Sequence, residues 1–213
     1  MANGTFIAIE GIDGSGKGTI CQMLADELGK RFKVILTAEP SNSPFGKKLR
    51  LMLAKDKNPS ANAEKYMDLF VKDREHHCKN TLLPALASGF VVLCDRYKYS
   101  TLAFQSAQGI PPQKIIKMHK GLPVPDLAII LDVTPRIAMA RMEGRGKKKE
   151  KFEKLEFMRT LRANYSSLPK LLPKENIKKV NANKPVKQVF SAALKLVEKQ
   201  LAKAQKAAAR SAG

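Results

Sequence analysis

Residues 5–19 read TFIAIEGIDGSGKGT, an apolar run followed directly by a glycine-rich turn. The run Thr5–Glu10 has the length and composition of a strand, and a helical pattern begins after Lys17. Between them, Gly11 to Lys17 has the spacing GxxxxGK. Glycines permit a tight turn in which backbone N–H groups and the helix N-terminus point at phosphate oxygens. The stretch therefore predicts a binding loop for a nucleoside triphosphate, with the Lys17 ammonium group on its β- and γ-phosphates.

One position of this loop departs from the usual motif. Gly18 follows the lysine, where a serine or threonine usually supplies a hydroxyl that binds magnesium. We therefore expect Mg²⁺ to be held largely through water, and Thr19 to contact the α-phosphate of ATP. The residues expected to contact the nucleotide in this loop are Gly11, Asp13, Gly14, Ser15, Gly16, Lys17, Gly18 and Thr19.

Four further apolar runs follow, and helical patterns separate them. Strands that alternate with helices indicate right-handed crossovers and a parallel sheet covered on both faces. The sequence thus predicts an α/β protein with the three-layer P-loop NTPase fold, a five-stranded parallel sheet flanked by helices, in one domain over residues 1–213. The expected strands are Thr5–Glu10, Lys33–Thr37, Val91–Cys94, Leu127–Asp132 and Ile177–Val180. The expected helices are 18–29, 44–54, 61–88, 98–108, 112–120, 135–143, 152–172 and 185–207, with a break or kink at Pro84.

Two segments of the C-terminal half have an unusual composition. Residues 143–151 read EGRGKKKEK and contain no apolar side chain, which predicts a mobile basic loop between two helices. The tail after Glu198 favours a helix but has little to bury, so we expect it to fray.

The net charge of the chain is +20 and is concentrated in its C-terminal third. Such a charge attracts nucleic acid or anionic surfaces, but the cations are spread over several expected helices without interleaved aromatic residues. We therefore favour a solvated basic surface and expect no nucleic-acid binding. The three cysteines form no CxxC pair, and no apolar run reaches the ~20 residues of a membrane span. We expect buried, reduced thiols and a cytoplasmic protein without a membrane segment.

Several stretches resemble the motifs of one kinase family. Residues 95–105, DRYKYSTLAFQ, resemble the DRYxxSxxAYQ motif of thymidylate kinases, with Phe104 in place of tyrosine. Residues 70–74, FVKDR, are similar to the FxxxR segment of that family, and residues 37–40, TAEP, to its TREP loop. The matches run in the family's order from Phe6 to about Val180. The resemblance implies an ATP:dTMP phosphotransferase that uses Mg²⁺, has dTMP as its substrate and forms a homodimer.

The resemblance also implies a role for each matching residue. Phe70 would stack on the thymine ring, Arg74 would reach the base carbonyl, and Thr101 would reach the adjacent ring nitrogen. Arg96 would hold the 5′-phosphate, because a guanidinium group binds two oxygens at once, and Phe104 would leave no room for a ribose 2′-hydroxyl. The residues expected to contact dTMP are Asp13 (at the 3′-hydroxyl), Glu39, Phe70, Arg74, Arg96, Ser100, Thr101 and Phe104.

Catalysis would rest on alignment and charge neutralisation, because the acceptor is already an ionised phosphate oxygen. Asp95 would position magnesium through water. Gly14 stands where some relatives have an arginine directed at the transferring phosphate, and a basic lid is the family's usual substitute. Residues 143–151 are the expected lid, with Arg145 as its main cation and Arg141 as a second contact to the nucleotide. The expected catalytic residues are Lys17, Asp95, Arg96 and Arg145.

Five residues near these motifs receive no role in chemistry. His76, His77 and His119 lack metal-ligand spacing and are expected as surface or helix residues. Tyr97 and Tyr99 are expected to serve in packing.

Two other classes of function stay open at this point. A P-loop kinase for AMP, CMP, UMP or a deoxynucleoside is compatible with Gly18, although the base and sugar motifs oppose it. A non-catalytic nucleotide- or nucleic-acid-binding protein would use the basic C-terminal third, although the combination of Lys17, Asp95 and Arg96 opposes it. The release of ADP with a panel of acceptors separates these alternatives.

Overall fold

The computed structural model describes residues 4–56, 59–142 and 148–212 of the chain. Five strands form one sheet in which every neighbouring pair is parallel, in the order β2-β3-β1-β4-β5. The predicted α/β class and parallel sheet are therefore confirmed. The strands are β1 (Thr5–Glu10), β2 (Val34–Ala38), β3 (Val91–Asp95), β4 (Leu127–Asp132) and β5 (Ile177–Asn181).

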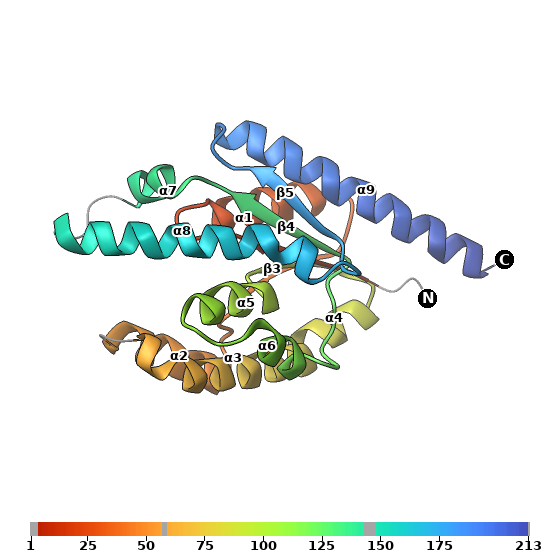
Figure 1. The fold of residues 1–213 in the computed structure, drawn as a ribbon. Coiled ribbons are helices and arrows are strands. Elements are labelled where there is room, and N and C mark those ends of the chain that lie inside the picture. The colour runs from red at the N-terminus through yellow and green to blue at the C-terminus, as the bar shows by residue number, and fades with distance from the viewer. Residues whose placement is uncertain (1–3, 57–58, 143–147, 213) are drawn as a thin grey trace.

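Helices cover both faces of the sheet, as Figure 1 shows. α1 (Lys17–Leu28) and α9 (Val186–Ala212) pack against each other and against one face. α4 (Leu83–Ala87) and α8 (Lys148–Leu171) pack against the other face, with α5 (Lys98–Ala107) alongside α8. The other helical segments are α2 (Pro44–Lys55), η1 (Pro59–Asn62), α3 (Ala63–His77), η2 (Cys78–Leu82), α6 (Pro112–Met118) and α7 (Pro135–Arg141).

Pro84 does not end the long third helix. The chain stays helical from Ala63 to Ala87, but the segment η2 immediately before the proline is a π-helix. Its wider turn lets the N–H of Leu83 donate to the carbonyl of Cys78, five residues back. Proline lacks an N–H group and its ring crowds the preceding turn, so the π-helical turn accommodates it without breaking the helix.

Two boundaries near the C-terminus differ from the prediction. α8 begins at Lys148 rather than at residue 152, so residues 148–151 belong to a helix and not to the expected loop. Arg145 and the rest of 143–147 lie outside the described residues. α9 continues to Ala212 instead of fraying after Glu198. Its Leu201 is still buried in the core, and the alanine- and lysine-rich turns beyond it have high helix propensity.

The sheet brings the expected functional segments to one edge. β1 is the central strand and all six of its residues are buried. β1 runs parallel to β3, and Ile9 lies opposite Asp95. The turn after β1 and the Asp95-Arg96 pair therefore lie next to each other, at the ends of neighbouring strands. In an open parallel sheet, ligands bind at this carboxyl edge.

Two further features of the packing agree with the sequence. Cys21, Cys78 and Cys94 are buried and free. Among the helices in the described ranges, none is both long and apolar enough to cross a bilayer.

Outside the main core, a smaller cluster of Leu49 and Tyr66 with Leu69 joins α2 to α3, and Phe70 packs against it.

Candidate active site

The glycine-rich turn after β1 depends on glycine at several positions. Gly11, Gly14 and Gly16 have φ angles of 142°, 77° and 91°, a region that side chains with a Cβ rarely adopt. A Cβ on Gly14 would also collide with the backbone of Ala138 on α7. A side chain at position 14 would therefore require α7 to lie elsewhere.

Lys17 begins α1 and is buried against the turn. Its Nζ donates to the carbonyls of Gly11 and Ile12, at 3.0 Å and 3.1 Å. Burial lowers the pKa of Lys17 to about 8, and the nearby charge of Arg96 lowers it as well, whereas Asp13 raises it. The nearby carboxylates therefore do not offset the burial of the Lys17 ammonium group, and a phosphate bound beside it would stabilise its charged form.

A cavity of about 460 Å³ opens above this turn. Gly11 and Ser15 lie buried beneath it, and Arg141 lies apart from it, where its guanidinium donates to the carbonyl of Ala182 at 2.9 Å. The structure therefore brings most of the expected nucleotide contacts to one cavity, but not Arg141. The lining residues are Asp13, Gly14, Gly16, Lys17, Gly18, Thr19, Ala38, Glu39, Asp95 and Arg96.

Asp95 ends β3 opposite the turn. A Cβ placed on Gly18 would lie 3.7 Å from its Oδ2, so the side chain missing at that position would have pointed at this carboxylate. Burial raises the pKa of Asp95, while the charges of Lys17 and Arg96 lower it. Within the described residues, no group of three or more His, Cys, Asp or Glu side chains could hold a metal ion. The donor set fits Mg²⁺ held mainly by phosphates and water, with Asp95 as a contact through water.

Arg96 lies between the two halves of the site. Its φ of 71° is the only left-handed value among the described non-glycine residues, and such a conformation persists where surrounding contacts impose it. Its guanidinium forms an ion pair with Asp13 and donates to the hydroxyls of Ser100 (3.0 Å) and Tyr165 (3.4 Å). It also lies 5.4 Å from the centre of the Phe104 ring. These contacts fix its position at the mouth of both cavities.

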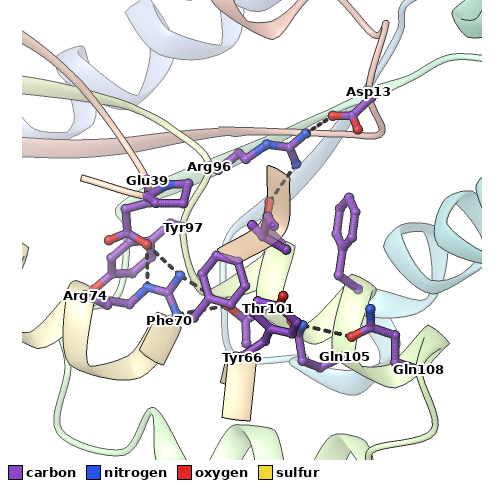
Figure 2. A pocket seen from close by; sticks show the side chains of 14 residues that line it. Asp13, Glu39, Tyr66, Phe70, Arg74, Arg96, Tyr97, Thr101, Gln105 and Gln108 are labelled. Atoms are coloured by element: carbon purple, nitrogen blue, oxygen red, sulfur yellow. Dashed lines mark hydrogen bonds and ion pairs between the residues drawn. The ribbon is translucent and has the colours of Figure 1, made fainter. Parts of the chain in front are cut away.

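A second cavity, of about 210 Å³, lies between α3 and α5. All eight residues expected to contact dTMP line it, and Figure 2 shows their side chains converging from separate elements. It shares Asp13, Glu39 and Arg96 with the cavity above the glycine-rich turn. The other lining residues, which the sequence did not single out as contacts, are Pro40, Leu53, Tyr66, Tyr97, Gln105 and Gln108.

Arg74 forms the charged floor of this second cavity. It is almost fully buried, and its Nε and a terminal nitrogen contact Oε2 of Glu39 at 2.7 Å and 2.5 Å. Both terminal nitrogens lie 3.3 Å from the hydroxyl of Thr101, and the guanidinium lies 4.9 Å from the centre of the Tyr97 ring. Glu39 thus contacts Arg74 directly, so in this structure it holds the arginine as well as lining the cavity.

The combination of a phosphate loop and an aromatic, arginine-floored pocket agrees with the comparison to known proteins. The sequence profile described as thymidylate kinase matches residues 9–193. The chain belongs to the thymidylate kinase family. It is 40% identical over 194 residues to a probable thymidylate kinase of Archaeoglobus fulgidus, covering 90% of this chain and 94% of that protein.

Other members of the thymidylate kinase family are similarly close. A probable thymidylate kinase of Pyrococcus horikoshii is 38% identical over 202 residues, covering 93% of this chain and 98% of that protein. The thymidylate kinase of Leptospira borgpetersenii is 39% identical over 176 residues, covering 81% and 83%. The similarity therefore spans both cavities.

Beyond the motifs of the thymidylate kinase family, the structure adds Glu10, which the sequence analysis missed. This fully buried carboxylate accepts hydrogen bonds from the N–H of Tyr97 (2.7 Å) and from the hydroxyls of Ser100 (2.6 Å) and Tyr165 (3.1 Å). Burial raises the pKa of Glu10, while the hydrogen bond from Ser100 and the charge of Arg96 lower it. Glu10 therefore holds the turn that carries Arg96. A carboxylate at the end of an apolar buried strand is a signal that the sequence did offer.

The sequence analysis expected the three histidines to be surface or helix residues without a role in chemistry. His77 and His119 lie on or next to helices but are buried. His77 contacts Glu39 through Nδ1 (3.1 Å) and Thr37 through Nε2 (2.8 Å). His119 contacts Arg74. Their partners are distant in the sequence, so no local pattern could reveal these contacts.

Buried polar atoms without a hydrogen-bond partner also occur in the region of the two cavities. In the described part of the chain, three buried side-chain atoms lack a hydrogen-bond partner: Ser15 Oγ, Asp95 Oδ1 and Gln105 Oε1. Ser15 belongs to the glycine-rich turn but lines neither cavity, whereas Asp95 lines the first cavity and Gln105 lines the second. Leaving a buried polar group unpaired costs about 1–3 kcal/mol. The two residues that line the cavities, Asp95 and Gln105, can find these partners in ligands and their water.

Proposed function

We propose that this chain transfers the γ-phosphoryl group of ATP to dTMP with Mg²⁺, which yields ADP and dTDP. The observation that carries the proposal is that the two cavities meet at Asp13, Glu39 and Arg96. A donor bound in the first cavity and an acceptor bound in the second would face each other across Arg96. Membership of the thymidylate kinase family supports the same pair of substrates.

The first cavity suits the donor. The glycine-rich turn would bind the β- and γ-phosphates through backbone N–H groups, and Lys17 would move from its carbonyl contacts to the phosphate oxygens. Magnesium, when bound, neutralises the charge that develops on the transferred group. The unpaired Oδ1 of Asp95 would accept a hydrogen bond from one of its water ligands.

The second cavity suits the base of a thymidylate. Phe70 would stack on the ring, as expected from the sequence. Thymine presents two carbonyl acceptors on either side of one N–H donor. Arg74 offers N–H donors on its Thr101 side for a carbonyl, and the unpaired Oε1 of Gln105 offers an acceptor for the ring N–H. We therefore assign Gln105 to the ring nitrogen, beside Thr101.

The chemistry needs no general base. The attacking oxygen of dTMP is ionised, so the chain has to align it with the γ-phosphorus and neutralise charge. Arg96 would hold the acceptor phosphate, Asp13 the 3′-hydroxyl, and Lys17 the donor phosphates. Phe104 would lie beside the sugar and exclude a 2′-hydroxyl, and the position of its ring near Arg96 supports this role.

Further assignments concern the lid, the second basic contact, the assembly and the location of the protein. Arg145, the expected lid cation, lies outside the described residues and stays a prediction, and the contact of Arg141 with Ala182 leaves its proposed role on the nucleotide to be tested. We propose that the protein forms a homodimer and that it is located in the cytoplasm. The buried, free cysteines support the proposed location, because disulfides are rare in that compartment. The absence of nucleic-acid binding also stays a prediction.

An acceptor panel tests the proposal. Purified protein with ATP and Mg²⁺ is given dTMP, dUMP, dCMP, AMP, CMP, UMP or thymidine, and ADP release and product identity are measured. We expect the highest kcat/KM with dTMP and formation of dTDP. A preference for another acceptor would support the alternative kinase assignment, and salt-sensitive RNA binding without ADP formation would support a non-catalytic binding protein.

A further inference from the structure

The guanidinium group of Arg74 is bonded on several sides at once. Glu39 accepts from Nε and from one terminal nitrogen, and Thr101 lies within 3.3 Å of both terminal nitrogens. The remaining neighbour is His119, whose Nε2 contacts the terminal nitrogen NH1. His119 does not line the cavity, so any effect it has on a ligand there must pass through Arg74.

The chemistry of these neighbours determines which nitrogen of His119 carries the proton. Nδ1 lies 2.7 Å from the carbonyl oxygen of Ile115, which can only accept, so Nδ1 must donate. A guanidinium group can only donate, so Nε2 must accept from Arg74. Both contacts are satisfied only by a neutral ring protonated on Nδ1. Burial, together with the charge of Arg74, lowers the pKa of His119 to about 3, in agreement with a neutral ring.

The local structure holds the ring in this orientation. His119 follows the last residue of α6, one turn after Ile115, and its N–H bonds to the carbonyl of Ile116. Two residues later Gly121 has a φ of 87°, which turns the chain away from the helix. α6 packs on α5, which carries Thr101. The acceptor and the hydroxyl that flank Arg74 are therefore fixed relative to each other.

We propose that His119 is a positioning residue for base recognition: by accepting from NH1 it fixes the rotation of Arg74 so that the two N–H groups on its Thr101 side, which now contact the Thr101 hydroxyl, face the 4-carbonyl of a pyrimidine. The inference rests on the proposed function, since it deepens the recognition of thymine. A base with a 4-amino group, such as cytosine, would instead place its own N–H donors against the N–H donors of Arg74. His119 would thus contribute to discrimination between dTMP and dCMP without touching either.

Variants at position 119 separate this role from general packing. His119→Leu and His119→Phe remove the acceptor, whereas His119→Gln keeps an acceptor and a donor at similar reach. We expect the two apolar variants to raise the KM for dTMP roughly tenfold and to lower the ratio of kcat/KM for dTMP over dCMP by a similar factor. The KM for ATP should stay within about twofold, and His119→Gln should restore most of the dTMP affinity.

A matched control is available on α3. His76 is half-buried, its ring contacts Phe45, and it lines neither cavity. His76→Leu should leave the KM for both substrates and the base selectivity unchanged. If His119→Leu and His119→Phe also leave the KM for dTMP and the selectivity within twofold of wild type, or raise both KM values equally, the proposal is overturned.

The protonation state of His119 gives a readout that does not depend on activity. Nitrogen-15 NMR of the histidine rings, assigned with His119→Gln, should show a neutral His119 with its proton on Nδ1 at neutral pH. A proton on Nε2, or a doubly protonated ring, would overturn the contact. A wild-type protein that formed no dTDP would instead overturn the proposed function, while the NMR result would still decide the His119–Arg74 contact.

Discussion

The two cavities of this site are built in opposite ways. The donor cavity centres on consecutive residues, Gly11 to Thr19, and uses backbone groups and one lysine. The acceptor cavity draws fourteen side chains from several elements and is floored by the buried pair of Arg74 and Glu39. Backbone N–H groups are available wherever the chain turns correctly, whereas a buried ion pair depends on every neighbour.

This difference separates catalysis from stability. Lys17 in the donor cavity contacts backbone carbonyls, so its loss leaves no directly paired charge behind in the core. The loss of Arg74 from the acceptor cavity does leave one, because Arg74 and Glu39 are both buried and are partners of each other. We therefore expect Lys17 variants to lose rate, and Arg74 variants to lose rate and stability together.

The largest expected effect is at Lys17. Lys17→Ala should reduce kcat by about 10³-fold or more, because no other group of the turn carries a positive charge to the donor phosphates. The temperature of unfolding should stay near that of wild type or rise, since a partly buried ammonium is removed. Steady-state kinetics and thermal unfolding measure the two quantities, with the exposed Lys30→Ala as control. Turnover near the wild-type value would contradict the assigned role.

At Arg74, in contrast to Lys17, we expect a large loss of stability. Arg74→Met leaves Glu39 buried without its main partner, which should lower the free energy of unfolding by about 3–5 kcal/mol. The double variant Arg74→Met/Glu39→Gln removes the uncompensated charge and should regain much of this stability without regaining affinity for dTMP. Denaturant unfolding and the KM for dTMP check both parts. A single variant as stable as wild type would show that the pair is not coupled.

Gln105 should separate binding from stability within the acceptor cavity. Gln105→Leu removes the acceptor proposed for the ring N–H, so the KM for dTMP should rise about tenfold, the equivalent of one hydrogen bond. The stability of the free protein should be unchanged or higher, because a buried unpaired oxygen is lost. Gln113→Leu, on the exposed side of α6, is the control. An unchanged KM for dTMP would remove Gln105 from the site.

The smallest expected effect near neutral pH is a pH dependence of the donor cavity. The pKa of Lys17 is about 8, and the ammonium form that binds phosphate exists below that value. The kcat/KM for ATP at saturating dTMP should therefore fall above pH 8, approaching tenfold per pH unit, as the enzyme–dTMP complex loses this proton. Lys17→Arg keeps its charge in this range and should lack the decline. A flat wild-type profile up to pH 9.5 would contradict the lowered pKa.

Sequence reasoning succeeded where residues close in the chain act together. The order of strands and helices and the glycine-rich turn depend on local periodicity and spacing, and the structure confirms the parallel sheet. The eight residues expected around dTMP were found through resemblance to the thymidylate kinase family, and all of them line one cavity. The start of α8 and the extent of α9 were misjudged, because local composition does not reveal how far a helix continues past its buried face.

Sequence alone determined the glycine-rich turn after β1, because its proposed function depends on backbone geometry that glycine spacing encodes directly. Only the tertiary structure decided that Glu10 holds the turn of Arg96 and that His119 accepts from Arg74. These contacts join residues 87 and 45 positions apart. Whether a buried carboxylate or imidazole acts as an anchor depends on which donors the fold brings within hydrogen-bond distance, and no local pattern carries that information.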